Sequence, residues 1–188
     1  MSTEYVVRLA GPAHVDQLPA IERAAATRFG DSLPESVLSH ATPVDDLAAA
    51  QQAGLLWVAL EPAGAPVGFA VASVGGQRVH LEELDVLPAH GRKGVGAALV
   101  EAVEEYALKG DCTEITLTTF RDVPWNAPFY ARIGFEAIPE QELDAELLRH
   151  LSDETALGLE RSRRVAMRKQ VTVKTGDPVP VYEQVVDQ

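Results

Sequence analysis

Cysteine is nearly absent from this sequence, since Cys112 is the only one among 188 residues. A single cysteine excludes an internal disulfide and a zinc site built from cysteines, so we expect Cys112 to be a small buried apolar side chain beside a strand. Basic residues are also few, because 16 Lys and Arg stand against 28 Asp and Glu and give a formal charge of -12. That balance argues against nucleic acid or an acidic membrane as a partner. It serves solubility, or it attracts a cationic substrate.

Long apolar runs are lacking too, because none approaches the roughly 18 to 20 residues that a membrane-spanning helix needs. Residues 1–9 have neither the basic start nor the apolar core of a signal peptide, so we expect a cytoplasmic protein. The chain is long enough to bury a core, with 46% hydrophobic residues. We expect a single domain over residues 1–173, followed by a C-terminal tail at 174–188.

The spacing of apolar residues predicts alternating strands and helices. Strands are predicted at 5–9, 55–60, 67–74, 79–87, 114–120, 135–138 and 164–171. Helices are predicted at 13–29, 95–109, 127–133 and 141–151, with one or two short helices within 32–53. This order indicates a mixed α/β (α+β) domain whose central sheet is mostly antiparallel and has helices on both faces.

The most informative stretch is 79–109, where an apolar and acidic strand runs into a glycine turn and then an amphipathic helix. The turn has the spacing G-x-x-G-x-G at Gly91, Gly94 and Gly96, with Arg92 and Lys93 between them. Free N–H groups at a helix start, with glycines that let a ligand approach, favour an anion such as phosphate. The spacing fits neither the dinucleotide fingerprint nor the ATP-binding loop. A tight connection without a ligand is the alternative.

Two segments together resemble the GCN5-related N-acetyltransferases, known as the GNAT family. The first is Leu84-Asp85-Val86-Leu87-Pro88 followed by Gly91-Arg92-Lys93-Gly94-Val95-Gly96-Ala97. The second is NAPFYARIGF, which begins at Asn126 and ends at Phe135. The order of elements matches over roughly residues 4–171. Gly91 departs from the Gln or Arg that usually opens the family's turn.

The resemblance implies the acyl-CoA N-acyltransferase fold and acetyl-CoA as the cofactor, with no metal. The pyrophosphate would bind the backbone of Arg92 to Ala97, and the pantetheine arm would lie along Leu84 to Val86. Asn126 and Phe129 would flank the thiol end. The expected cofactor-binding residues are Leu84, Asp85, Val86, Gly91, Arg92, Lys93, Gly94, Val95, Gly96, Ala97, Asn126 and Phe129.

The same resemblance implies catalytic roles. Tyr130 stands at the family's frequent general-acid position and would protonate the CoA thiolate; the alternative is a ring that only packs in the core. Glu82 and Glu83 lie near where relatives carry a base. Strand alternation sends them to opposite faces unless a bulge intervenes, with Glu82 preferred and Glu83 second. His80 shares the face of Glu82 and could relay a proton.

The expected function is acetyl transfer from acetyl-CoA to a primary amine, directly within a ternary complex. A non-catalytic acyl-CoA-binding or sensor module of the same fold is the alternative. The acceptor is expected to be a small amine, polyamine-like or amino-acid-like, with a protein or peptide amine still open. We expect a homodimer, in which 179–186 of the tail adds an edge strand to a second subunit or packs on its own domain.

Overall fold

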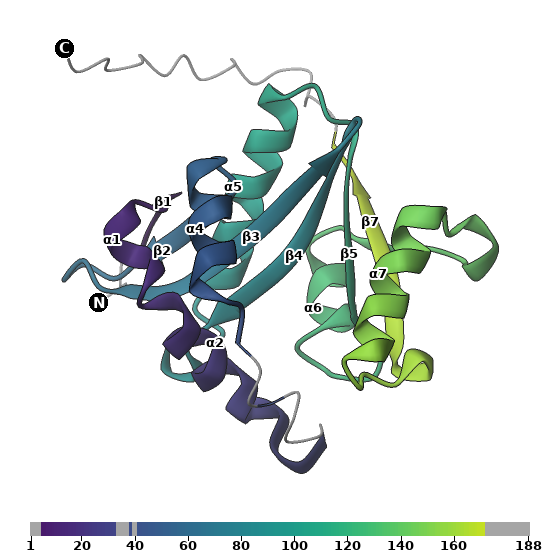
Figure 1. The fold of residues 1–188 in the computed structure, drawn as a ribbon, viewed down its shortest axis with the longest axis horizontal. Coiled ribbons are helices and arrows are strands. Elements are labelled where there is room, and N and C mark those ends of the chain that lie inside the picture. The colour runs from purple at the N-terminus through teal and green to yellow at the C-terminus, as the bar shows by residue number, and fades with distance from the viewer. Residues whose placement is uncertain (1–4, 33–37, 39–40, 172–188) are drawn as a thin grey trace.

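Seven strands form one sheet in the computed structural model, which describes residues 5–32, 38 and 41–171 (Figure 1). The strand order is β1-β2-β3-β4-β5-β7-β6, and β4 and β5 are the only parallel neighbours among these strands. The strands are β1 (Val6–Leu9), β2 (Leu56–Leu60), β3 (Pro66–Gly75), β4 (Arg78–Val86), β5 (Glu114–Phe120), β6 (Glu136–Ala137) and β7 (Arg164–Gln170). The predicted mixed, mostly antiparallel sheet is confirmed.

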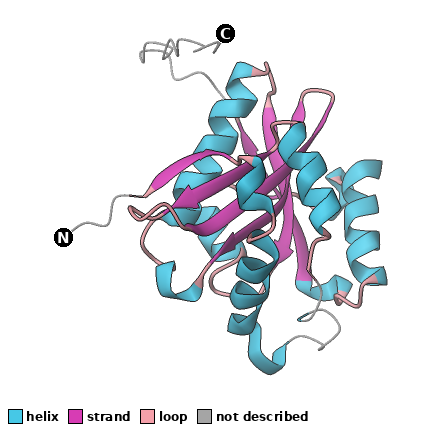
Figure 2. Cartoon of the chain, turned by 60° about the vertical axis from the view of Figure 1, so that its left-hand side comes forward, coloured by secondary structure: helices cyan, strands magenta, loops and turns pink. Residues whose placement is uncertain are grey.

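Helices cover both faces of the sheet (Figure 2). The face turned toward the viewer in Figure 1, here called the front face, carries α1 (Pro12–Val15), α2 (Leu18–Ala26), α4 (Val44–Gln52) and α7 (Ala145–Ala156). The back face carries α5 (Val95–Lys109) and α6 (Ala127–Arg132). The apolar side of α5 follows its sequence period, since Val95, Leu99 and Val103 are all buried against the sheet. No helix among the described residues is long and apolar enough to cross a membrane.

The strands β4 and β5 separate toward their carboxyl ends. They pair from Arg78 and Glu114 only as far as Leu81 and Leu117, after which the ladder stops. Figure 1 shows the two strands together at one end and apart at the other. The split leaves the edge of β4 beyond Leu81 without a strand neighbour on that side, and this gap positions the site described below.

A β-bulge interrupts β4 at the point where the split begins. On β3, Val71 pairs with Glu83 while the next residue, Ala72, pairs with Leu81, so Glu82 is an extra residue. Leu81 and Leu84 both pack in the core on the back face. The two residues between them are therefore both free to face the front, which strict alternation would forbid.

Two helix predictions need correction. The helix predicted at 13–29 is broken into α1 and α2, because Pro19 in the first turn of α2 cannot continue a preceding helix. The helix predicted at 141–151 begins only at Ala145, where the Asp144 carboxylate accepts a hydrogen bond from Leu147 N at 3.0 Å. Cys112 is buried as predicted. Residues 174–188, which carry the predicted tail, lie outside the described residues.

Candidate active site

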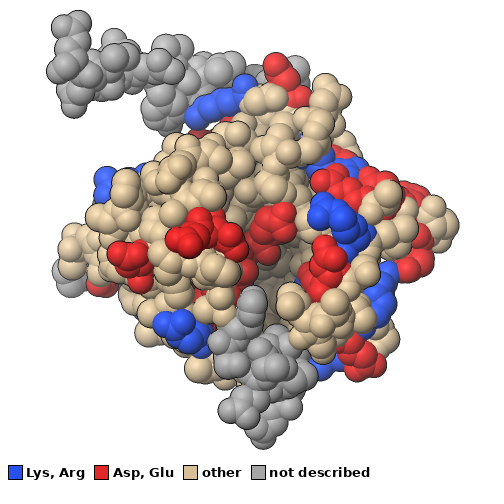
Figure 3. All heavy atoms as spheres, in the orientation of Figure 1, with Lys and Arg blue, Asp and Glu red and all other residues tan. Residues whose placement is uncertain are grey.

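A cavity of about 1000 Å³ lies over the split between β4 and β5. Its walls come from α2, β4, β5, α6, α7 and the glycine turn, which are far apart in sequence. Figure 3 shows this face with acidic side chains on both sides of the central hollow. The lining carboxylates come from α2, β4 and α7: Glu22, Glu82, Glu83, Asp85, Glu146, Asp153 and Glu154.

Glu83 and Asp85 form a close pair of carboxyl groups on the front side of β4. They are two residues apart beyond the bulge, so their side chains share one face. Burial and the charge of Asp85 raise the pKa of Glu83 well above its ordinary value, and burial raises the pKa of Asp85 to about 7. One Asp85 oxygen, Oδ2, is buried without a hydrogen-bond partner among the described residues. Such a pair shares a proton near neutral pH, because two adjacent buried carboxylates cannot both ionise freely.

Glu22 of α2 adds a third carboxylate beside this pair. Its side chain is buried and accepts a hydrogen bond from Thr42 N at 2.8 Å. The charge of Glu22 contributes to the raised pKa values of both Glu83 and Asp85. The cavity therefore holds concentrated negative potential on the α2 side of β4, which favours a cation there.

Tyr130 belongs to α6 and lines the same cavity as the carboxyl pair. Its ring packs against Phe129 and Phe135, with ring centroids 5.0 and 5.6 Å away. Burial raises the pKa of the Tyr130 phenol, and the charges of Asp85 and Glu83 raise it further. The phenol therefore stays protonated at neutral pH and is available as a donor within the cavity.

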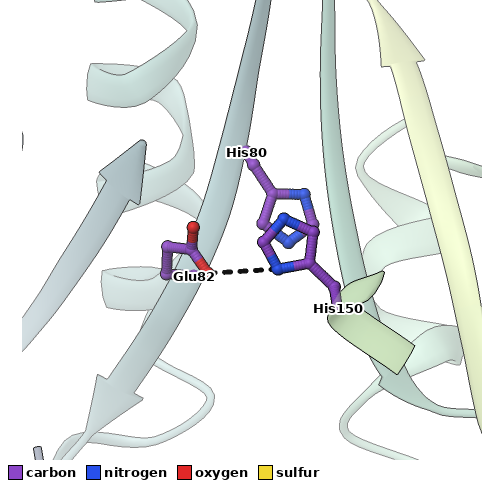
Figure 4. Close-up of side chains that lie close together, drawn as sticks. All are labelled: His80, Glu82 and His150. Carbon is purple, nitrogen blue, oxygen red and sulfur yellow. Dashed lines mark ion pairs between the residues drawn. The ribbon is translucent and has the colours of Figure 1, made fainter. Parts of the chain in front are cut away.

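Glu82, the other predicted base, turns toward α7 instead (Figure 4). Its Oε1 accepts a hydrogen bond from Ser73 Oγ at 2.6 Å, and its Oε2 lies 3.8 Å from Nδ1 of His150. The buried His80 stacks on the His150 ring, with centroids 3.9 Å apart and planes 9° apart. Burial, then the His150 charge, lowers the pKa of His80 to about 3, so this imidazole is neutral.

His80, Glu82 and His150 together offer three ligand atoms within 4.8 Å of one another. A metal ion bonds to an imidazole nitrogen in the plane of the ring. Two rings that are parallel and 3.9 Å apart direct their nitrogen lone pairs along separate planes, not toward one point. His80 Nδ1 is also 2.9 Å from Thr116 Oγ1, which fixes its ring. The cluster therefore has the ligand atoms that a metal site needs, but the lone pairs of its two imidazoles do not converge on one point.

The glycine turn after β4 presents free backbone N–H groups to the cavity. Gly94 precedes α5 in the left-handed conformation, with φ of 85°, and no side chain caps the helix. Arg92 also has a positive φ of 59°, which is uncommon for a residue with a Cβ. Gly91 has an ordinary φ of -64°, so the strained position of the turn is Arg92. An uncapped helix start with the positive dipole end fits a phosphate.

Gly96 lies where the turn meets the cavity wall. A Cβ added there would come within 3.4 Å of the Phe129 ring and 3.9 Å of the side chains of Leu84 and Val86. Most of the predicted cofactor residues thus meet at the cavity wall, whereas Lys93 and Val95 do not line the cavity and Val95 is buried in the core. Asn126 stands at the start of α6, but its side chain does not cap the helix: its Nδ2 donates to Thr119 Oγ1 at 3.0 Å, and this ties the start of α6 to β5. Asn126 still lines the cavity.

Trp125 and two aromatic partners close one end of the cavity. Phe29 packs between Phe120 and Trp125, with centroids 5.3 and 5.9 Å away, so the segment after α2 reaches across to the end of β5. Trp125 is therefore both a wall of the cavity and a packing partner of Phe29.

Sequence reasoning missed several lining residues, including Glu22, His150 and the ion pair of Arg164 with Glu154. Arg164 donates to both Glu154 oxygens, at 2.8 and 2.5 Å. Each of these residues reaches the cavity from an element far from the two motifs. A single helical or strand pattern gives no signal for such contacts. Asp85 was predicted to bind the pantetheine arm as part of the strand Leu84 to Val86, but the position of its side chain beside Glu83 was not predicted.

Comparison with known proteins identifies the family. The family model described as the acetyltransferase (GNAT) family matches residues 20–135, which is more than half of the chain. A PaiA N-acetyltransferase from Thermoplasma acidophilum, solved with coenzyme A, has a TM-score of 0.67 and 15% identity over 89% of this chain and 99% of that one. The ribosomal-protein-S18-alanine N-acetyltransferase of Escherichia coli has a TM-score of 0.64 and 14% identity, covering 93% and 99%.

N-acetylglutamate synthase from Neisseria gonorrhoeae, complexed with coenzyme A and N-acetyl-glutamate, has a TM-score of 0.68 and 15% identity over 92% of this chain and 36% of that one. These identities are low, so the structural matches establish the fold. The split sheet, the uncapped helix after the glycine turn and the family match agree, and the chain belongs to the GNAT family of acetyltransferases.

Proposed function

We propose that the protein transfers the acetyl group of acetyl-CoA to the primary amine of a small cationic acceptor, directly within a ternary complex. The observation that carries this proposal is the arrangement of Glu83, Asp85 and Tyr130 around one cavity. A proton acceptor and a proton donor in the same cavity meet the two needs of acyl transfer to an amine. The coenzyme supplies an activated thioester.

The residues of the cleft suit the coenzyme at one end. The N–H groups of residues 92–97 would hold the pyrophosphate, and the free edge of β4 at Leu84 to Val86 would pair with the amides of the pantetheine arm. Lys93 and Arg92 add positive charge beside that turn. Phe129 would wall the thiol end, close to Tyr130.

The carboxyl pair would receive the proton of the attacking amine. An amine attacks only when neutral, and a carboxyl group with a raised pKa holds that proton better than an ordinary one. We assign the Glu83–Asp85 pair as the base, because one shared proton leaves one carboxylate of the pair to accept the proton of the amine. The new carbon–nitrogen bond forms as the carbon–sulfur bond breaks. Tyr130 gives its proton to the departing thiolate, so no covalent enzyme intermediate is needed.

The acceptor class follows from the charge around Glu83. Glu22, Glu83 and Asp85 lie together on the α2 side, and no Lys or Arg forms an ion pair with Glu83 or Asp85 among the described residues. A second positive charge on the acceptor would bind there while the reacting amine approaches the thioester. A diamine or polyamine fits this arrangement better than an amino acid, whose carboxylate would be repelled.

Calorimetry with acetyl-CoA, followed by thiol release across an amine panel, tests the proposal. We expect binding in the micromolar range and faster turnover with diamines than with amino acids of equal length. A protein that ignores acetyl-CoA at millimolar concentration is not this enzyme. A protein that binds it but releases no thiol with any amine is the acyl-CoA-binding or sensor module.

Tyr130→Phe separates chemistry from binding. We expect turnover to fall about 100-fold while the dissociation constant of acetyl-CoA changes less than about twofold, because only the proton donor is lost. Unchanged turnover would remove Tyr130 from the acid role. The expected homodimer and cytoplasmic location remain predictions, and light scattering on the full chain and on a chain ending at residue 176 tests the former.

A further inference from the structure

A second cavity, of about 350 Å³, opens beside the glycine turn. Three of its seven lining residues are arginines and none is acidic: Arg28, Pro88, Gly91, Arg92, Pro124, Trp125 and Arg132. The chain has 28 acidic and 16 basic residues, so a cavity with only positive charge runs against its composition. A concave site with clustered guanidinium groups attracts an anion.

The three arginines come from three separate parts of the fold. Arg28 belongs to the helical segment Thr27–Ser32, Arg92 to the glycine turn, and Arg132 is the last residue of α6. The Arg28 guanidinium lies 4.7 Å from the centroid of the Trp125 ring, which holds it over the cavity. Three positive charges from distant segments repel one another when they lie this close, so a bound anion would stabilise their arrangement.

No described carboxylate neutralises this cluster. Arg78, Arg161 and Arg164 each pair with an acidic side chain. Among the side chains that the structure describes, none forms an ion pair with Arg28, Arg92 or Arg132. Burial and the charge of Arg92 lower the pKa of Arg28, so the free protein bears an electrostatic cost here. A bound dianion would relieve it.

The position of this cavity indicates which phosphate group of CoA would bind there. It shares Arg28, Gly91, Arg92, Trp125 and Arg132 with the main cavity, so it is a side bay at the phosphate end. The backbone N–H groups of the turn already suit the pyrophosphate of CoA. The remaining anionic group of that molecule is the phosphate monoester on the ribose, next to the pyrophosphate.

We propose that Arg28, Arg92 and Arg132 form a binding site for the 3′-phosphate of CoA, and that the protein thereby distinguishes CoA from its 3′-dephospho form. This inference rests on the proposed use of CoA. Apart from Arg28, the bay is lined by residues that follow the end of β4, whereas Glu83 lies within the strand. It would therefore bind the acetyl donor, CoA, and not the amine that accepts the acetyl group. Guanidinium groups suit this role, because they donate paired hydrogen bonds to phosphate oxygens.

Calorimetric titration with CoA and with 3′-dephospho-CoA tests the site. The wild-type protein is expected to bind CoA at least about tenfold more tightly, as charged hydrogen bonds to phosphate predict. In Arg28→Gln the affinity for CoA should fall toward that for the dephospho form, whose own affinity stays within about twofold. Arg132→Gln should reduce the same gap.

Arg8→Gln is the matched control, because it removes one exposed positive charge from β1, outside the bay. It should leave the ratio of the two affinities unchanged. Thermal melting of each variant checks that it folds. Equal binding of the two ligands by the wild-type protein would overturn this inference alone, as would equal weakening of both by Arg28→Gln. Failure to bind either ligand would overturn the proposed use of CoA, and this inference with it.

Discussion

The two ends of the cleft differ in charge and in the groups that supply it. Near Glu83 the charge is negative and comes from carboxyl groups on β4 and α2 that raise one another's pKa. Near Arg92 it is positive and comes from guanidinium groups, a helix dipole and free N–H groups. One end can exchange a proton near neutral pH, whereas the other keeps a fixed charge. The carboxyl end therefore suits proton transfer, and the guanidinium end suits binding of a phosphate.

Substitution of Glu83 tests the acidic end with the largest expected effect. Glu83→Gln should lower turnover about 100- to 1,000-fold, because the base is lost, with little change in CoA affinity. Glu82→Gln changes the adjacent residue in the same way, but Glu82 is held by Ser73 and lies toward His150. Its turnover should fall less than about fivefold. Equal losses in steady-state thiol release would contradict the assignment of the base to the Glu83–Asp85 pair and not to Glu82.

Substitution of Gly96 tests the phosphate end. The new methyl group of Gly96→Ala would lie 3.4 Å from Phe129, in the space where a ligand approaches the backbone. The dissociation constant of CoA should rise about tenfold by calorimetry, while the melting temperature rises slightly because alanine favours a helix. Gly11→Ala, which meets only ordinary contacts at 3.7 Å, should leave CoA binding unchanged. Tighter CoA binding by Gly96→Ala would contradict the assignment.

The thermal stability of Asp85→Asn tests whether Asp85 has a raised pKa in the folded protein. The pKa of Asp85 is raised in the folded state to about 7, so its protonated form is favoured and stability is lost as the pH rises through that value. The variant should melt roughly 3–5 °C above the wild type at pH 8, and the gain should shrink toward pH 5.

The matched control for that experiment is Asp16→Asn, which changes an exposed aspartate outside the cleft. It should show no such gain at either pH. A wild-type melting temperature that increases between pH 6 and 8 relative to Asp85→Asn would contradict the shared-proton pair.

The smallest expected effect concerns zinc at His80, Glu82 and His150. Because the two rings are parallel, they do not direct nitrogen lone pairs at a common point. Added zinc should shift the melting temperature by less than about 1 °C, and His150→Gln should not change that shift. A rise of several degrees that His150→Gln abolishes would show that the acidic end takes a metal ion.

Much of the fold was predictable because local patterns specify it. The apolar period of α5, the glycine turn and the strand β5 (Glu114–Phe120) were predicted at or near their observed bounds. The family resemblance also came from two short motifs. Long-range contacts were not predictable in this way: His150 meets His80 only because α7 packs on the front face beside β4.

The bulge at Glu82 is the clearest example of a feature that the sequence alone did not predict. Alternation along β4 assigns Glu82 and Glu83 to opposite faces, and only the pairing with β3 shows that an extra residue breaks it. The arginine bay is a second case, because Arg28 and Arg132 are about a hundred positions apart in sequence. Positive residues scattered along an acidic chain give no sign of their convergence.

The early end of the β4–β5 ladder has a consequence for exchange with solvent. Strand edges normally recruit another strand, and proteins shield them for that reason. Here two edges face each other beyond Leu81 and Leu117 inside one molecule, across a gap that the sheet leaves unfilled. A ligand with its own amides would complete the sheet as a temporary strand. Amide protons along this gap should then exchange quickly in the free protein and slowly once the coenzyme is bound, so that protection from deuterium reports occupancy.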